Sequence, residues 1–163
     1  MIVDMTTLDP NNLMTDAKAI DRYIHGGKGE VTLVSTQSHK AHTYRFYSPI
    51  NKTAFPEGTI FVYVVHEDRQ MYIGMLSESG FRLTARSSFG YNTEAVKGAD
   101  YIVKMANNQE LIDRKGMLLY HSGRCCVCGR SLSKTASLHK GIGRHCIKIY
   151  DELSSKVPWD GNS

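Results

Sequence analysis

The four cysteines of this 163-residue chain all lie within residues 125–146. Cys125 and Cys128 form a CxxC pair followed by glycine, the tight turn with which zinc knuckles and ribbons present two thiolates to one ion. The glycine leaves backbone N–H groups free to approach the sulfurs, and Cys146 supplies a third thiolate. A redox CxxC pair would not use Cys146, and a disulfide framework would spread its cysteines across the fold. The spacing therefore predicts one structural zinc ion.

A tetrahedral zinc site needs a fourth donor. The candidates are His121, Cys126, His139 and His145. Cys126 and His145 each adjoin a stronger ligand, and adjacent side chains diverge too far to share one small ion. His121 follows the apolar run 117–120, which is typical of a strand that delivers it to the loop, whereas His139 lies in a polar segment. We favour His121 as the fourth ligand and keep His139 as the alternative.

The sequence around the cysteines does not favour catalysis. A catalytic zinc ion usually keeps an open position near a carboxylate base, and residues 114–150 contain no Asp or Glu. Elsewhere no serine or cysteine nucleophile has an organised base, because the cysteines are assigned to the metal and the other histidines fall on turns or strand ends. We therefore expect that the protein is not an enzyme.

The cysteine segment resembles a known domain family. The sequence HSGRCCVCGRSLS from position 121, followed by GIGRHC from position 141, is similar to a small zinc-finger-like domain common in bacteriophage and bacterial proteins. The family pattern is close to H-x-G-R-C-x-x-C-G-R-x-L-T, then S, then G-I-G-P-x-C. Ser133 replaces the usual Thr, and Arg144 replaces the usual Pro and adds a positive charge. The resemblance implies a phage origin and one metal set: His121, Cys125, Cys128 and Cys146.

The positive charge of the chain is concentrated in the same segment. The chain has 20 Lys and Arg and 16 Asp and Glu, a formal charge of +4. Residues 114–150 hold eight of these basic residues and no acidic one, so the remainder, with 12 basic and 16 acidic residues, carries −4. The eight are Arg114, Lys115, Arg124, Arg130, Lys134, Lys140, Arg144 and Lys148. A basic lobe on an acidic body favours attraction to a polyanion, although a solvated lysine surface has the same composition.

Two classes of function agree with this pattern. The first is a nucleic-acid-binding protein in which zinc holds the basic knuckle and five side chains contact phosphates. These are Arg124, Arg130, Lys134, Lys140 and Arg144. The alternative is a protein-binding effector that inhibits or masks a host protein, such as a nucleic-acid or defence enzyme. The salt dependence of binding distinguishes the two classes. Non-specific nucleic-acid binding weakens steeply as the salt concentration rises, whereas binding through a protein interface with an apolar centre depends on salt much less.

The elements that position this cluster are predicted from periodicity. Alternating residues predict strands over 31–36, 42–47, 59–65, 71–76 and 81–86. Helices are predicted over 15–24, 92–106 and 143–153. Thr15 and Asn92 are the expected N-caps of the first two, and the third carries Cys146. Val96, Ala99, Val103 and Ala106 form the expected packing stripe of the second helix. The predicted fold is α+β, an antiparallel β-meander of about five strands packed by one or two helices, with a C-terminal zinc knuckle closed by a short helix.

The strands also carry many aromatic residues. Tyr44 and Phe46 alternate with Arg45 and Tyr47, and Phe61 shares a strand face with Tyr63. Aromatic and arginine side chains exposed together can stack bases, as in single-strand binders. A half-buried sheet uses the same residues in its core and in cross-strand pairs. For each single aromatic residue we favour the core interpretation.

The chain is divided by these patterns into four parts. They are an N-terminal helix and turn (1–29), a meander and helix body (30–115), a basic zinc-finger-like module (116–155) and a tail (156–163) that contains Trp159. No apolar run is long enough to cross a membrane, and the N-terminus lacks the layout of a signal peptide. Cysteines packed beside histidines suit a reducing compartment. We expect a cytoplasmic protein, in the host cytoplasm if a phage encodes it.

Overall fold

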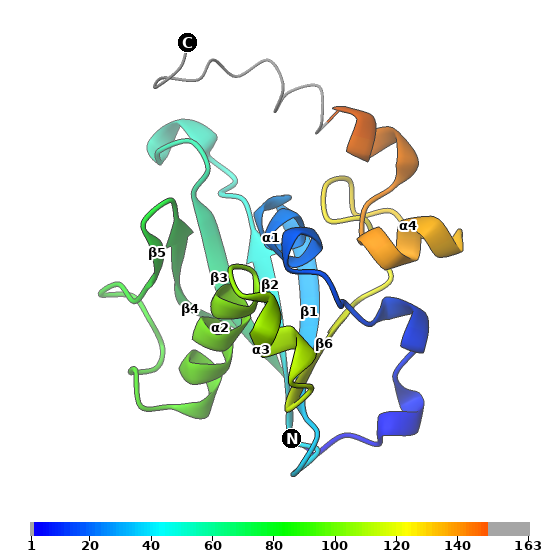
Figure 1. Cartoon of the computed structure of the whole chain (residues 1–163). Coiled ribbons are helices and arrows are strands. Elements are labelled where there is room, and N and C mark those ends of the chain that lie inside the picture. Colours follow the sequence, from blue (N-terminus) through cyan, green and yellow to red (C-terminus); the bar gives the residue numbers. More distant parts are fainter. Residues whose placement is uncertain (1, 150–163) are drawn as a thin grey trace.

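The alternating segments of the chain form the predicted antiparallel meander (Figure 1). The computed structural model describes residues 2–149. Its first five strands follow one another in sequence: β1 (Lys28–Ser35), β2 (Ala41–Tyr47), β3 (Ile60–His66), β4 (Arg69–Ser77) and β5 (Gly80–Arg82). Each strand pairs antiparallel with the one before it. The α+β class and the five-stranded meander are therefore confirmed.

A sixth strand, β6 (Met117–His121), adds to the sheet beside β1, so that the strand order is β5-β4-β3-β2-β1-β6. The sequence predicted a strand here but not its partner. β6 pairs antiparallel with β1, with His121 opposite Val31 and Leu119 opposite Leu33. The first strand of the predicted module 116–155 is thus an edge strand of the body's sheet. The cysteine loop begins directly from that edge.

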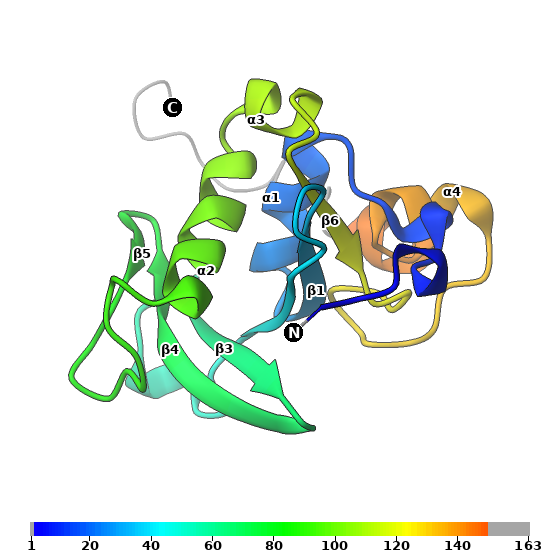
Figure 2. The same ribbon diagram turned by 90° about the horizontal axis from the view of Figure 1, so that it is seen from below.

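The longer helices lie on one face of the sheet (Figure 2). The helices are α1 (Ala17–His25), α2 (Glu94–Met105), α3 (Gln109–Asp113) and α4 (Thr135–Lys140), with short 3-10 turns η1 (Met5–Thr7), η2 (Pro10–Asn12) and η3 (Lys52–Ala54). Residues 144–149 are helical as predicted, and the rest of the helix predicted over 143–153, like the tail with Trp159, lies outside the described residues. No helix in the described part of the chain has the length and apolar character needed to cross a membrane.

The N-caps of α1 and α2 each lie one residue after the predicted ones. Asp16, rather than Thr15, caps α1, and its carboxylate accepts a hydrogen bond from the Ala19 N–H at 3.0 Å. Thr93, rather than Asn92, caps α2. In each case the neighbouring side chain also had a cap-forming oxygen, so that the residue type alone did not distinguish the two positions.

The buried stripe of α2 is also rotated from the predicted one. Val96, Ala99 and Ala106 are buried as predicted, but Ile102 and Met105 also belong to the stripe. Val103, which was predicted to face the sheet, is only partly buried. Its place is taken by Ile102, which lies three residues after Ala99 on the same helix face.

The hydrophobic core lies between the sheet and the helices and extends into the cysteine loop. Tyr44 and Phe46 are fully buried on the helix-covered face, which confirms the core interpretation for these two. The Tyr44 hydroxyl donates a 2.6 Å hydrogen bond to the Ala95 carbonyl of α2. Cys125 and Ile142 belong to the same continuous core. The loop between β6 and α4 (residues 122–134), which we call the metal loop, therefore packs as part of the body.

Candidate metal centre

Three sulfur atoms meet at one edge of the sheet. The Sγ atoms of Cys125, Cys128 and Cys146 all lie within 4.8 Å of one another. Among the described residues, these three side chains are placed so that they could hold one metal ion. The first two cysteines come from the loop after β6, and Cys146 comes from the first turn of the helical residues 144–149. Three thiolates at this separation suit a tetrahedral ion such as zinc.

The backbone around Cys125 supports a thiolate. Its Sγ accepts hydrogen bonds from the N–H groups of Val127 at 3.4 Å and Gly143 at 3.3 Å. Burial alone would raise the pKa of the Cys125 thiol, but backbone and side-chain hydrogen bonds outweigh it and lower that pKa. N–H groups that point at a sulfur stabilise its anionic form, which is the form that binds metal. The residues present therefore fit a zinc ion.

The fourth cysteine is turned into the core. Cys126 is fully buried, and its Sγ lies 3.9 Å from the Arg22 carbonyl of α1. A Cβ placed on Gly26 would lie only 2.7 Å from the Cys126 sulfur, so the end of α1 packs directly against this residue. Burial raises the pKa of the Cys126 thiol to about 12. Cys126 is thus a neutral core thiol that does not belong to the group of three sulfurs.

His121, the predicted fourth ligand, does not join the three sulfurs. Its Nδ1 accepts a hydrogen bond from the Gly123 N–H at 2.9 Å, and its Nε2 donates to the Leu138 carbonyl of α4. The ring also stacks on Tyr23, with 5.5 Å between centroids. Burial lowers the pKa of His121 and keeps the ring neutral. The His121 ring lies between α1 and α4 because β6, which carries it, pairs with β1. The sequence did not predict this pairing.

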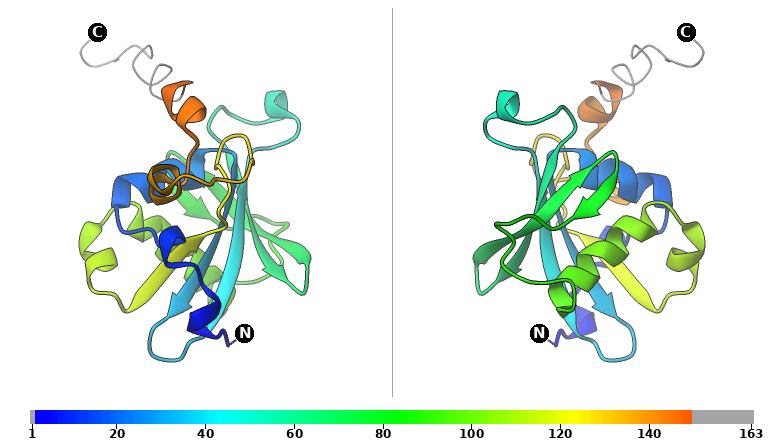
Figure 3. Two further views of the ribbon diagram at one scale, coloured as in Figure 1. Left: turned by 90° about the vertical axis from the view of Figure 1, so that its right-hand side faces the viewer. Right: turned by 90° about the vertical axis from the view of Figure 1, so that its left-hand side faces the viewer.

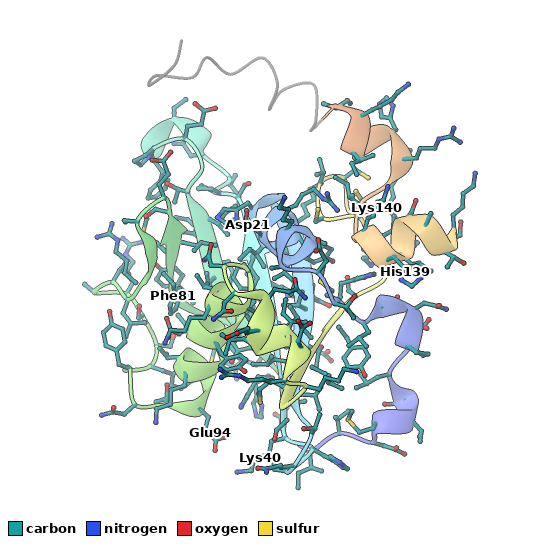
Figure 4. All side chains as sticks on the ribbon, in the orientation of Figure 1. Asp21, Lys40, Phe81, Glu94, His139 and Lys140 are labelled. Atoms are coloured by element: carbon teal, nitrogen blue, oxygen red, sulfur yellow. The ribbon has the colours of Figure 1, made fainter. Side chains whose placement is uncertain are left out.

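The alternative ligand, His139, is exposed near the end of α4, next to Lys140 (Figure 4). It is likewise absent from the sulfur group. The polar segment that contains His139, for which the sequence predicts no helix, forms the short helix α4. The structure therefore places neither candidate histidine beside the sulfurs.

Replacing His121 with glutamine is expected to leave the metal content unchanged and to lower the free energy of unfolding by about 1–3 kcal/mol, because a buried hydrogen-bonding ring is lost. Native mass spectrometry and urea denaturation measure the two effects. His139→Gln is the matched control and is expected to change neither, since its side chain is exposed. If the His121→Gln variant lost the metal, that result would show that His121 is a ligand.

The metal loop is fixed to α1 by a buried tyrosine. Tyr23 is fully buried, and its single hydroxyl proton is shared between the carbonyl oxygens of Arg124 at 3.1 Å and Glu30 at 3.3 Å. Burial raises the pKa of Tyr23 to about 12, so the hydroxyl remains a donor at neutral pH. Two further bonds hold the loop, from the Lys28 N–H to the Cys126 carbonyl at 2.8 Å and from Arg22 Nη2 to the Lys140 carbonyl at 3.1 Å.

The sequence analysis did not identify Tyr23, because it lies about a hundred positions before the loop that it supports. Gly141, in contrast, could have been identified from the sequence. It follows α4 in the left-handed conformation (φ 69°), where glycine is the favoured residue after a helix. A Cβ at this position would also lie 2.5 Å from the Tyr23 ring. Gly141 therefore both ends α4 and lies against Tyr23, the residue that holds the metal loop to α1.

The five predicted phosphate-contacting side chains are all exposed. They are Arg124, Arg130, Lys134, Lys140 and Arg144. Within residues 2–149 none of them forms an ion pair with a carboxylate. Their charge is therefore not neutralised by acidic neighbours in the described part of the chain. The loop and α4 that carry most of them lie at the β6 edge, far from β5 (Figure 1).

Comparison with known proteins finds similarity in this part of the chain. Residues 120–150 match a family of unknown function, DUF6011. The match includes the end of β6, the cysteine loop, α4 and the helical residues that carry Cys146. No curated protein and no solved structure matches the chain. The matched segment and the three-sulfur group coincide, which supports a zinc-finger-like domain here.

Proposed function

We propose that the protein is a non-catalytic zinc-binding protein that binds nucleic acid, DNA or RNA, through its basic C-terminal segment. The observation that carries the proposal is that residues 114–150, which supply the three sulfurs, contain eight basic residues and no acidic one. All eight are exposed, and within residues 2–149 only Arg114 of the eight pairs with a carboxylate, that of Glu110. Unpaired basic side chains attract phosphates without reading sequence.

In this proposal zinc has a structural role. One Zn²⁺ with three thiolates contributes a net charge of about −1, so the segment remains strongly positive with the ion bound. Binding of structural zinc supplies roughly 10–16 kcal/mol of apparent free energy in small zinc domains. That free energy orders the short loop and holds its arginines and lysines in place.

The resemblance of the cysteine segment to domains common in phages supports a phage origin. A phage protein of this kind would act in the cytoplasm of the host cell. Purification from infected cells, followed by sequencing of bound nucleic acid, tests both the location and the partner.

The double substitution Arg130→Glu with Arg144→Glu is expected to abolish retention of short DNA and RNA, because it reverses two exposed charges on the metal-bearing segment. Binding of the unchanged protein should weaken steeply with salt, with log K falling by about 0.7–0.9 per phosphate contact for each unit of log salt. Fluorescence anisotropy across a salt series measures both effects. Zinc content should be unchanged.

The matched control is Lys18→Glu with Lys97→Glu, which makes the same change in charge at exposed positions of α1 and α2. The control is expected to bind nearly as well as the unchanged protein. Undiminished binding by the Arg130 and Arg144 variant would reject the proposed interface. If the unchanged protein retained no nucleic acid at low salt, a host protein would become the better candidate partner.

A further inference from the structure

The face of the sheet opposite the helices carries a set of aromatic side chains. In both views of Figure 3, α2 and α3 lie to one side of the strands. Strand alternation places Tyr47, Phe61, Tyr63 and Tyr72 on the other side, and all four are partly exposed. We call these four residues the aromatic face. The fully buried Tyr44 occupies the opposite side of β2.

The four rings are neighbours across three strands. Tyr47 is paired with Phe61, and Tyr63 with Tyr72, in the strand register. Ring centroids are 6.3 Å apart for Tyr47 and Tyr63, 5.9 Å for Tyr63 and Tyr72, and 5.7 Å for Phe61 and Tyr72. The Tyr72 hydroxyl also lies 3.0 Å from the Thr84 hydroxyl, which fixes its ring. The rings form one ordered surface and not isolated exposed residues.

A hollow of about 700 Å³ opens over this surface. Phe61, Tyr63 and Tyr72 form its floor, and Phe55 and Arg86 contribute to its walls. Phe55 meets Phe61 edge to face at 4.9 Å. The lining is mostly apolar, with one arginine, which suits a flat unsaturated group that carries a nearby negative charge.

A second hollow, of about 600 Å³, lies between the metal loop and the same side of the sheet. Its charged lining residues are Lys28, Glu30, Arg45 and Arg124. Glu30 is paired with Arg45, with 2.7 Å between Oε1 and Nε, and within residues 2–149 no carboxylate pairs with Lys28 or Arg124. This hollow is therefore positive.

The two hollows adjoin at β2 and β3. Tyr47 lines the positive hollow and faces Phe61 of the aromatic hollow in the strand register. Arg45 of the positive hollow likewise faces Tyr63. A chain that leaves the metal loop along the positive hollow therefore arrives directly on the aromatic face.

We propose that single-stranded nucleic acid follows this path, with phosphates near Arg124 and Lys28 and with unpaired bases against Tyr47 and Tyr63. The inference rests on the proposed nucleic-acid function and specifies its substrate class. Positive side chains beside aromatic rings are what a single strand requires, since each base has a flat face for stacking and each linkage has a negative charge. A duplex keeps its bases stacked on one another and would use the basic segment alone.

The test is the affinity of the full chain for a labelled oligothymidine of about 12 nucleotides, within the range of known single-strand sites, and for the same strand annealed into a duplex. An oligouridine of equal length distinguishes RNA from DNA. Tyr47→Ala and Tyr63→Ala are each expected to weaken single-strand binding roughly 5- to 150-fold. Duplex binding should hardly change. Tyr101→Ala, a partly buried tyrosine of α2, is the matched control and should bind as the unchanged protein does.

The outcomes separate the two proposals. Single-strand binding that is lost in the Arg130 and Arg144 variant but unaffected by both tyrosine variants would overturn the path across the aromatic face and leave the proposed function standing. Equal or tighter binding of the duplex would also overturn it. Binding of neither oligonucleotide would reject the function and the inference together. If Tyr63→Ala unfolds, Tyr63→Leu keeps the apolar volume, removes the ring and should show the same loss.

Discussion

Replacing Cys125 or Cys146 with serine is expected to remove the metal and to disorder the segment after β6. The three sulfurs lie within 4.8 Å of one another, so each substitution removes one of the three thiolates that could hold one ion. Structural zinc supplies roughly 10–16 kcal/mol in small zinc domains, and no other contact in the loop is comparable. Metal analysis should show less than one ion per chain, and protease should cleave first within 121–149.

Cys126→Ser is the matched control for these substitutions. Cys126 differs from Cys125 by one position in the chain, but its sulfur points to α1 and not to the sulfur group. It is expected to keep the full metal content and to lose some stability, because a buried thiol is replaced by a more polar hydroxyl. Metal loss from Cys126→Ser that equals the loss from Cys125→Ser would contradict the assignment of ligands.

Tyr23→Ala is expected to lower the free energy of unfolding by about 3–5 kcal/mol, as the loss of a large buried aromatic side chain usually does. Tyr23 stacks on His121, and its hydroxyl reaches the carbonyl of Arg124. Removing it separates α1 from the metal loop at their main point of contact. Urea denaturation measures the loss, and the metal should also become easier to extract with a chelator.

Two other variants are expected to lower the free energy of unfolding less than Tyr23→Ala does. Tyr23→Phe keeps the ring and removes only the hydroxyl, so a loss of about 0.5–1.5 kcal/mol is expected. Tyr91→Ala removes a tyrosine that is 63% exposed, and its effect should be within about 0.5 kcal/mol. If Tyr23→Ala were as mild as Tyr91→Ala, the loop would not depend on α1 for its position.

The sequence was sufficient for the local parts of this structure. The meander follows from residues that alternate along the chain, and the approach of Cys125 to Cys128 follows from a tight turn. Cys146 was also predicted to join them, on a helix that the structure confirms over 144–149. The meander and the CxxC turn are determined by neighbours within a few residues, whereas Cys146 joins the pair from 18 positions after Cys128.

The unpredicted parts depend on distant contacts. Nothing in residues 117–121 specifies β1 as the partner of β6, yet this pairing determines where His121 points. Which side of the sheet is covered also depends on where α1, which directly precedes β1, and α2, which follows β5, pack against the strands. Alternation therefore predicted that Tyr44 and Tyr47 point in opposite directions, but not which of them would be buried.

Native mass spectrometry of the protein, purified without added metal, tests the central claim most directly. The account predicts one zinc ion per chain, lost after treatment with a chelator and absent from Cys125→Ser but not from Cys126→Ser. A metal-free chain in which Cys125, Cys128 and Cys146 react freely with an alkylating reagent would contradict it, because the basic segment would then lack the ion proposed to order it.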